Sequence, residues 1–404
     1  MDAQPLSPVG EAAVSRFAEQ VFAHLGRSDQ RRWARAYLQG LLSVPGRKSL
    51  ANMAAGLASG PTAAATVSLS LQQFVNGSTW DWRPARRVLA GLAAGPRPVR
   101  AWTAALVVVP KRGDQVVGVH RRFDARTGRT VKCQAASGLF VATDRDAVPV
   151  DWSLLLDPSW TDEPQRRARA RIPGDVAPLP AGELLVGMVD RLAAHHPVAP
   201  LVAGLDAAED PIRLAAALAR RSVPYVLEVR GGQAVRPVLQ ATTGRHGRVH
   251  QGTVPAESLF PRRRPRTSAD PQPVLRGTPV LPPGPATTAA PVTGTSAAPV
   301  HRLWARCDGD GGPRRYWLTD LAEDAPGVLA LLDAASATRS TVDRLGSDFG
   351  LLDFSGRSYT GWHHHMTLVS AAYALGRDLA VRAGGSGGTA GTARAAGGTL
   401  RDSA

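Results

Sequence analysis

Residues 102–109 read WTAALVVV, an apolar run from which the fold class can be worked out. The run predicts a buried strand, and the alternating stretches Gln115–Arg122 and Val131–Ala142 predict two strands beside it. Two shorter apolar stretches, Pro200–Gly204 and Pro224–Val229, flank a helical pattern and predict further buried strands. Three adjacent strands followed by a strand–helix–strand unit predict a mixed α/β sheet covered by helices.

The chain divides into five predicted segments around this sheet. A helical region over residues 11–95 precedes the first part of the α/β region, residues 99–230. Residues 231–300 are predicted to be an insertion, with short β-like pieces and then Arg-rich and Pro/Thr/Ala-rich stretches that cannot build a packed core. Residues 301–382 complete the α/β region. The Gly/Ala/Thr-rich residues 383–404 are predicted to be a disordered tail.

Composition indicates the class of partner. The chain has 48 Lys and Arg residues against 33 Asp and Glu residues, a formal net charge of +15. This excess indicates a polyanion, because each phosphate that a cation neutralises releases counterions. The alternative is an Arg-rich surface that reflects a GC-rich coding sequence. No apolar run reaches membrane-spanning length and the N-terminus lacks a signal-peptide pattern, so the sequence predicts a cytoplasmic protein without a membrane partner.

The helical region carries the first candidate DNA contacts. One face of its second predicted helix holds Arg31, Arg32 and Arg35, and Arg47 and Lys48 follow beyond the next turn. A solvated helix face is the alternative interpretation of these cations.

Several sequence blocks occur in an order that resembles the bacterial insertion-sequence transposases of the DDE superfamily. They are RRWA at 31–34, VGVHRRF at 117–123, LDPSWTDEPQRR at 156–167, YWL at 316–318 and GLLDFSGRSYTGWHHHMTL at 350–368. The resemblance implies an RNase H-like mixed sheet with flanking helices, an N-terminal helical DNA-binding domain and a β-rich insertion. It also implies DNA as the partner and transposition as the ancestral activity.

Transposases of this superfamily hold two Mg²⁺ ions with carboxylates from the first strand, the end of the fourth strand and a late helix. The resemblance places these positions at Ala105 or Leu106, at Leu205 and at Arg339. Alkyl groups supply no oxygen ligand, and a guanidinium repels a divalent cation. The chain is therefore predicted to be a DNA-binding relative without confident catalytic residues and without a metal cofactor.

Two alternatives remain open. Displaced acids could restore a Mg²⁺-dependent enzyme: Asp206 through a one-residue shift of register, Asp343 one helical turn after Arg339, or Asp114 beyond the first strand. The structural interpretation of Asp343 is an i,i+4 surface pair with Arg339. The second alternative is a non-catalytic regulatory partner of an active transposase. Homo-oligomers fit either alternative.

Two further motifs remain. Lys111 and Arg112 follow the first strand and join the candidate DNA contacts. The triplet His363-His364-His365 is not expected to bind a metal, because consecutive residues share neither a helix face nor a strand face. We expect these histidines to pack or to hydrogen-bond to the backbone.

Overall fold

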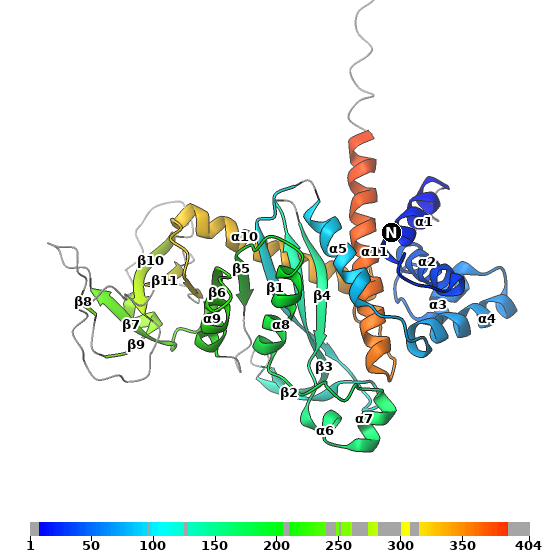
Figure 1. The fold of residues 1–404 in the computed structure, drawn as a ribbon, viewed down its shortest axis with the longest axis horizontal. Coiled ribbons are helices and arrows are strands. Elements are labelled where there is room, and N and C mark those ends of the chain that lie inside the picture. The colour runs from blue at the N-terminus through cyan, green and yellow to red at the C-terminus, as the bar shows by residue number, and fades with distance from the viewer. Residues whose placement is uncertain are drawn as a thin grey trace, which may run out of the picture.

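A single mixed sheet with helices on both faces forms the body of the molecule (Figure 1). The computed structural model describes residues 8–95, 97–124, 128–144, 146–204, 210–239, 248–249, 252–260, 274–281, 300–307 and 315–386. Leu205 and Asp206, the Arg-rich and Pro/Thr/Ala-rich stretches of the insertion, and most of the predicted tail lie outside these residues.

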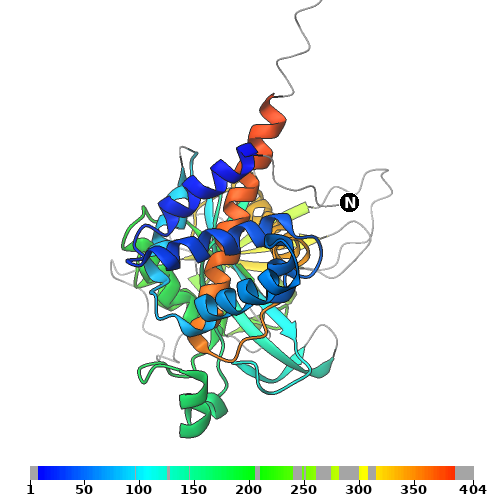
Figure 2. The ribbon, with the colours of Figure 1, turned by 90° about the vertical axis from the view of Figure 1, so that its right-hand side faces the viewer.

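The N-terminal region is helical, as the sequence predicts. Its elements are α1 (Pro8–Val21), α2 (Ser28–Ser43), α3 (Leu50–Leu57), α4 (Pro61–Gln72), the π-helical η1 (Gln73–Gly77) and α5 (Arg83–Ala94). In α2 the residues Tyr37, Leu38 and Leu41 recur at helical spacing and are buried. These helices pack beside the C-terminal helix α11, Tyr359–Ser386 (Figure 2).

The first half of the sheet follows the predicted strands. Its elements are β1 (Ala101–Pro110), β2 (Val119–Asp124), β3 (Arg129–Ala142), β4 (Ala147–Leu154), β5 (Leu201–Gly204) and β6 (Tyr225–Val229). β1 is central, since it pairs antiparallel with β3 and parallel with β5. The long β3 also pairs antiparallel with β2 and β4, and β6 pairs parallel with β5. The sequence did not predict β4, because Pro149 and Asp151 interrupt its apolar pattern.

The predicted insertion region and the strands after it continue the same sheet. Their elements are β7 (Ala234–Leu239), β8 (Arg248–Val249), β9 (Val254–Pro255), the 3₁₀ helix η2 (Ala256–Leu259), β10 (Val274–Leu281), β11 (His301–Cys307) and β12 (Arg315–Thr319). β12 pairs antiparallel with β6, and β11, β10 and β7 follow in that order. The described part of this region is therefore β-rich, as expected.

Helices cover the two faces of the sheet. Those after β4 are α6 (Pro158–Thr161), α7 (Pro164–Ala170), α8 (Ala181–Ala193), α9 (Pro211–Ala219) and α10 (Ala325–Ser347). The sequence pattern predicts two helices, Gly327–Ala337 and Thr341–Phe349, where the structure has only α10. No Gly or Pro separates the two stretches, so the backbone continues through Ser340. The last helix was predicted from Met366, and it begins earlier, at Tyr359.

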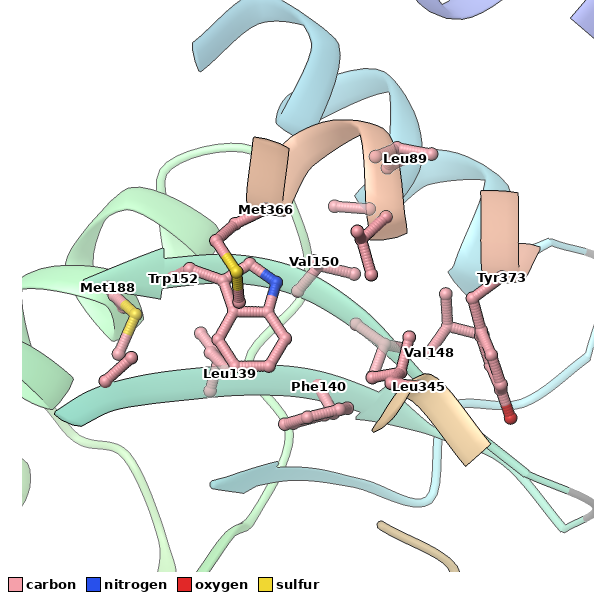
Figure 3. Close-up of a cluster of buried hydrophobic side chains, with 14 of the residues drawn as sticks. Leu89, Leu139, Phe140, Val148, Val150, Trp152, Met188, Leu345, Met366 and Tyr373 are labelled. Carbon is pink, nitrogen blue, oxygen red and sulfur yellow. The ribbon is translucent and has the colours of Figure 1, made fainter. Parts of the chain in front are cut away.

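The main core lies between β3, β4 and the helices around them (Figure 3). Phe140 and Trp152 from the strands meet Leu345 of α10, Met366 of α11 and Met188 of α8. All five side chains are buried. The predicted fold class is confirmed as a mixed α/β sheet with flanking helices. Within the part of the chain that the structure describes, we find no helix with the length and apolar character needed to span a bilayer.

Candidate catalytic pocket and DNA contacts

Two of the three positions expected to carry carboxylates line one pocket of ≈ 330 Å³, which we call the candidate catalytic pocket. Ala105 and Leu106 of β1 and Arg339 of α10 all line it. Gly204, the last residue of β5, lines it as well. Leu205 and Asp206 follow Gly204 directly but lie outside the described residues. Strands β1 and β5 run parallel, so both end at the same side of the sheet.

The register of β1 separates the two residues left open for the first position. Leu106 packs against a small buried cluster that includes Ala181 of α8, on one face of the sheet. Thr103 lies 2.5 Å, Oγ1 to Oγ1, from Thr338 of α10, on the other face. Side chains two residues apart in a strand point the same way, so Ala105 shares the α10 face with Thr103. Of the two residues left open for the first position, Ala105 is therefore the one on the face of β1 that lies against α10.

Helix α10 contributes a guanidinium and no carboxylate at the expected third position. Arg339 Nη2 donates to Ser336 Oγ at 2.9 Å, and both residues are exposed. The interpretation of Asp343 as a surface partner of Arg339 is wrong, because the Arg339 guanidinium hydrogen-bonds to Ser336 one turn earlier. Asp343 is exposed and does not line the pocket.

The pocket contains charged groups that the sequence did not single out. Glu228 of β6 accepts two hydrogen bonds from the Arg315 guanidinium of β12, at 2.8 and 2.7 Å. Arg306 of β11 lies opposite Arg315 in the strand register, and Asp333 of α10 is exposed at the same pocket. The only sequence signal for the Glu228–Arg315 pair was Glu228 itself, an acid inside the apolar strand YVLEV. Such an acid requires a partner.

The residues that line this pocket do not fit a two-metal site. Magnesium needs several oxygen ligands in near-octahedral geometry. Ala105 supplies none, the Glu228 carboxylate is bound in a fork by Arg315, and the Arg339 guanidinium would repel a cation. Within the ranges that the structure describes, no three His, Cys, Asp or Glu side chains are grouped to hold a metal ion.

Of the displaced acids proposed from the sequence, Asp206 lies outside the described residues, and Asp114 and Asp343 do not share a pocket. Asp114 lies in a different pocket, and Lys132 Nζ is 2.7 Å from its Oδ1. The hydrogen bond from Lys132, the largest influence, lowers the pKa of Asp114. The alternative in which Asp114 and Asp343 replace the lost metal ligands is thus corrected, because neither residue lines the candidate catalytic pocket.

The histidine triplet lies in the interior, at the start of α11. The His364 ring stacks on Trp80 with ring centroids 3.8 Å apart, and His363 stacks on Trp82 at 4.3 Å. We call these two stacked pairs, together with His365, the histidine layer. His364 Nδ1 lies 2.9 Å from the carbonyl oxygen of Val75, and its Nε2 lies 2.7 Å from that of Trp80. Burial lowers the pKa of His364 to about 4, so the neutral ring donates to only one of the two carbonyls.

His365 completes the layer, and each nitrogen of its neutral ring has a hydrogen-bond partner. The Tyr37 hydroxyl lies 3.0 Å from Nδ1, to which it can donate. Nε2 lies 3.0 Å from the Gly350 carbonyl oxygen and can donate to it. The expectation that the histidines pack and bond to the backbone is confirmed.

A buried ion pair, the Arg86–Asp151 network, joins α5 to the sheet and to α11. Arg86 Nη1 donates to Asp151 Oδ1 at 2.7 Å, and Arg86 Nε donates to Thr367 Oγ1 at 2.8 Å. The half-exposed Arg191 of α8 donates to the second oxygen of Asp151 at 2.9 Å. Burial, the largest influence, lowers the pKa of Arg86, and the charge of Asp151 opposes it. The network lies at a pocket of ≈ 540 Å³ between α5 and α8, away from the expected catalytic positions.

Two of the predicted DNA contacts have structural roles instead. Lys48 is only 6% exposed, and its ammonium donates to the Val44 carbonyl oxygen. Lys111 Nζ donates to the Phe354 carbonyl oxygen at 2.7 Å. Burial lowers the pKa of both lysines. The prediction that Lys48 and Lys111 contact DNA is therefore corrected. Their ammonium groups donate to backbone carbonyl oxygens and are not available to bind a phosphate.

The remaining five candidates are exposed: Arg31, Arg32, Arg35, Arg47 and Arg112. Arg32 lies over the Trp33 ring at 5.0 Å, and Arg47 makes a long ion pair of 3.7 Å with Asp353. Exposed pairs of this length contribute little, so the Arg32 and Arg47 guanidinium groups stay accessible to a phosphate. One nitrogen of the Arg31 guanidinium, in contrast, donates to the Leu25 carbonyl oxygen.

Comparison with known proteins gives one family. Residues 20–279 match the family described as DDE superfamily endonuclease. No curated protein matches the chain. Among solved structures the chain is similar to the piggyBac transposase in its synaptic complex with hairpin DNA. That match has a TM-score of 0.47 and 10% sequence identity, and it covers 93% of this chain and 73% of that chain.

Proposed function

The chain belongs to the DDE superfamily endonucleases, and on this premise we propose that it is a transposase-like DNA-binding protein that does not cut DNA. The proposal includes an insertion-sequence origin and a cytoplasmic location. One observation carries it: the pocket where three carboxylates would converge presents Ala105 on β1 and Arg339 on α10.

The loss of cleavage follows from the charges in this pocket. A two-metal mechanism needs carboxylates to hold both ions against the phosphodiester. Here three arginines, Arg306, Arg315 and Arg339, share the pocket with Glu228 and Asp333. Three cations and two anions leave a net charge of +1, whereas a site for two divalent cations requires negative charge.

The fold does not depend on carboxylates at these positions. Clustered carboxylates repel one another in the absence of metal, so alkyl side chains there cost no core stability. Ala105 contacts the core as a half-buried residue, and Arg339 is exposed on α10. A protein with these residues keeps the surface for binding DNA while it lacks the site for cutting it.

Metal binding tests the catalytic half of the proposal. We expect no heat of Mn²⁺ binding to the wild-type chain by isothermal titration calorimetry, and no Mn²⁺- or Mg²⁺-dependent nicking of supercoiled plasmid. A triple variant with Ala105→Asp, Leu205→Asp and Arg339→Glu restores three acids and is expected to bind Mn²⁺. Wild-type nicking that Asp333→Asn abolishes would show instead that the pocket's own acids support catalysis.

DNA binding tests the other half. We expect the full chain to bind a fluorescent 30-base-pair duplex in an anisotropy titration, with an affinity that falls as salt rises. The double variant Arg32→Gln and Arg35→Gln is expected to weaken binding and to flatten the salt dependence by about 1.8 in log–log slope. An affinity independent of salt would contradict contact with phosphates.

A further inference from the structure

A third pocket, of ≈ 390 Å³, is lined by residues of α6 and α7, of the segment that follows β1 and of the segment that precedes α11. We call it the arginine pocket, after Arg166, Arg169 and Arg357 in its lining. Its arginines come from two segments far apart in the sequence, since Arg166 and Arg169 belong to α7 and Arg357 precedes α11. The fold therefore brings together cations that no single helix or strand carries.

Arg166 is held in place before any ligand binds. Its guanidinium carbon lies 3.8 Å from the centroid of the Trp160 ring, and its Nη1 donates to Ser159 Oγ at 2.8 Å. Trp160 is itself buried, and its Nε1 donates to the Val119 carbonyl oxygen at 2.9 Å. A guanidinium fixed in this way loses little conformational entropy when it binds a phosphate.

The two other arginines of the pocket have guanidinium N–H groups that are not used in hydrogen bonds to described residues. Arg169 and Arg357 are both exposed. Neither forms an ion pair or a side-chain hydrogen bond with another residue in the described ranges. Their guanidinium groups can therefore turn towards an oxyanion that enters the pocket, which Gln165 also lines.

The surroundings of the pocket are cationic. Arg121 and Lys132 lie close enough to Asp114, at the pocket wall, to favour its ionised form together with Arg166. The lining itself carries three arginines and two acids, Asp114 and Glu163, so its net charge is +1, the same as that of the candidate catalytic pocket. Lys132 neutralises Asp114 directly, which reduces its repulsion of a phosphate.

We propose that the arginine pocket binds the phosphate backbone of double-stranded DNA, as a contact site separate from both the candidate catalytic pocket and the helical region. This inference rests on the proposed DNA-binding function. Guanidinium groups from several directions match the successive phosphates of a duplex, and contacts of this kind position the DNA without reading its sequence.

The test uses the full chain and a fluorescent 30-base-pair duplex in anisotropy titrations at several salt concentrations. The double variant Arg169→Gln with Arg357→Gln removes two pocket cations, neither of which is engaged within the described chain. We expect its affinity to fall roughly tenfold and its log–log salt slope to become shallower by about 1.8, as for two lost phosphate contacts. Equal melting temperatures for the variant and the wild type would establish that the fold is intact.

A matched control removes the same charge elsewhere. Arg220→Gln with Arg276→Gln changes two exposed arginines, one directly after α9 and one on β10, which do not line the arginine pocket. The inference requires the pocket variant to lose at least threefold more affinity than this control. Equal losses in the two variants would overturn it while leaving DNA binding itself intact. A wild-type chain that does not bind the duplex at all would overturn the proposed function, and the inference with it.

Discussion

The candidate catalytic pocket and the histidine layer both form where distant parts of the chain meet, but their polar groups are held very differently. In the histidine layer the three histidine rings are buried, and each contacts residues from other parts of the chain. In the pocket Arg339 and Asp333 are exposed, and Arg339 bonds only to a neighbour on its own helix. Polar groups of the first kind hold the fold together, whereas groups of the second kind can change without affecting it.

The largest effect is expected at the Arg86–Asp151 network, which adjoins the histidine layer. Replacing Arg86 by Met leaves the Asp151 carboxylate buried without its inner partner. We expect the free energy of unfolding, measured by urea denaturation, to fall by about 4 kcal/mol. Arg191→Met removes the half-exposed partner of the same carboxylate and should cost about 1 kcal/mol or less. Equal costs would show that burial does not set the strength of this network.

A smaller effect is expected from His365 as the pH falls. Burial lowers its pKa to about 4, against about 6.5 in an unfolded chain. The unfolded state therefore binds the proton first, and stability that is complete above pH 6.5 is lost between about pH 6.5 and 4. The expected loss is about 3 kcal/mol.

Urea denaturation at pH 7 and pH 4.5 measures this loss. The variant His365→Gln cannot titrate in this window, so its stability should depend less on pH than that of the wild type. The same pH dependence in both proteins would mean that His365 is not held neutral by the fold.

The smallest effect is expected at the candidate catalytic pocket. Arg339→Met should change the free energy of unfolding by less than about 0.5 kcal/mol, because the side chain is exposed and bonds only to Ser336. Its neighbour Thr338 is the control, since it is buried and hydrogen-bonded to Thr103. Thr338→Val should cost about 1 kcal/mol. A cost at Arg339 as large as that at Thr338 would remove the contrast between the two regions.

Strong local patterns made most of the sheet predictable. The apolar run of β1 and the short buried strands β5 and β6 could be located because their neighbours in sequence are turn and helix signals. β4 could not, since Pro149 and Asp151 mask a strand that is buried along its whole length. Asp151 is tolerated there only because Arg86 and Arg191 neutralise it, and those residues come from other elements.

The site was predictable in position but not in content. Ala105 and Arg339, which the resemblance assigns to two expected catalytic positions, line one pocket in the structure. The Glu228–Arg315 pair joins residues 87 apart in sequence and depends on how β6 pairs with β12. The burial of Lys48 likewise depends on the distant segment before α11. Contacts created by packing leave no local trace in the sequence.

One feature of the sheet bears on how the protein behaves in a crowded solution. β6 is the last strand of the parallel part of the sheet, and β12 pairs with it from Val226 to Val229. Without β12, β6 would be an edge strand with a bare row of amide and carbonyl groups, which recruits strands of other molecules. The strands that follow β6 thus also protect the sheet against aggregation.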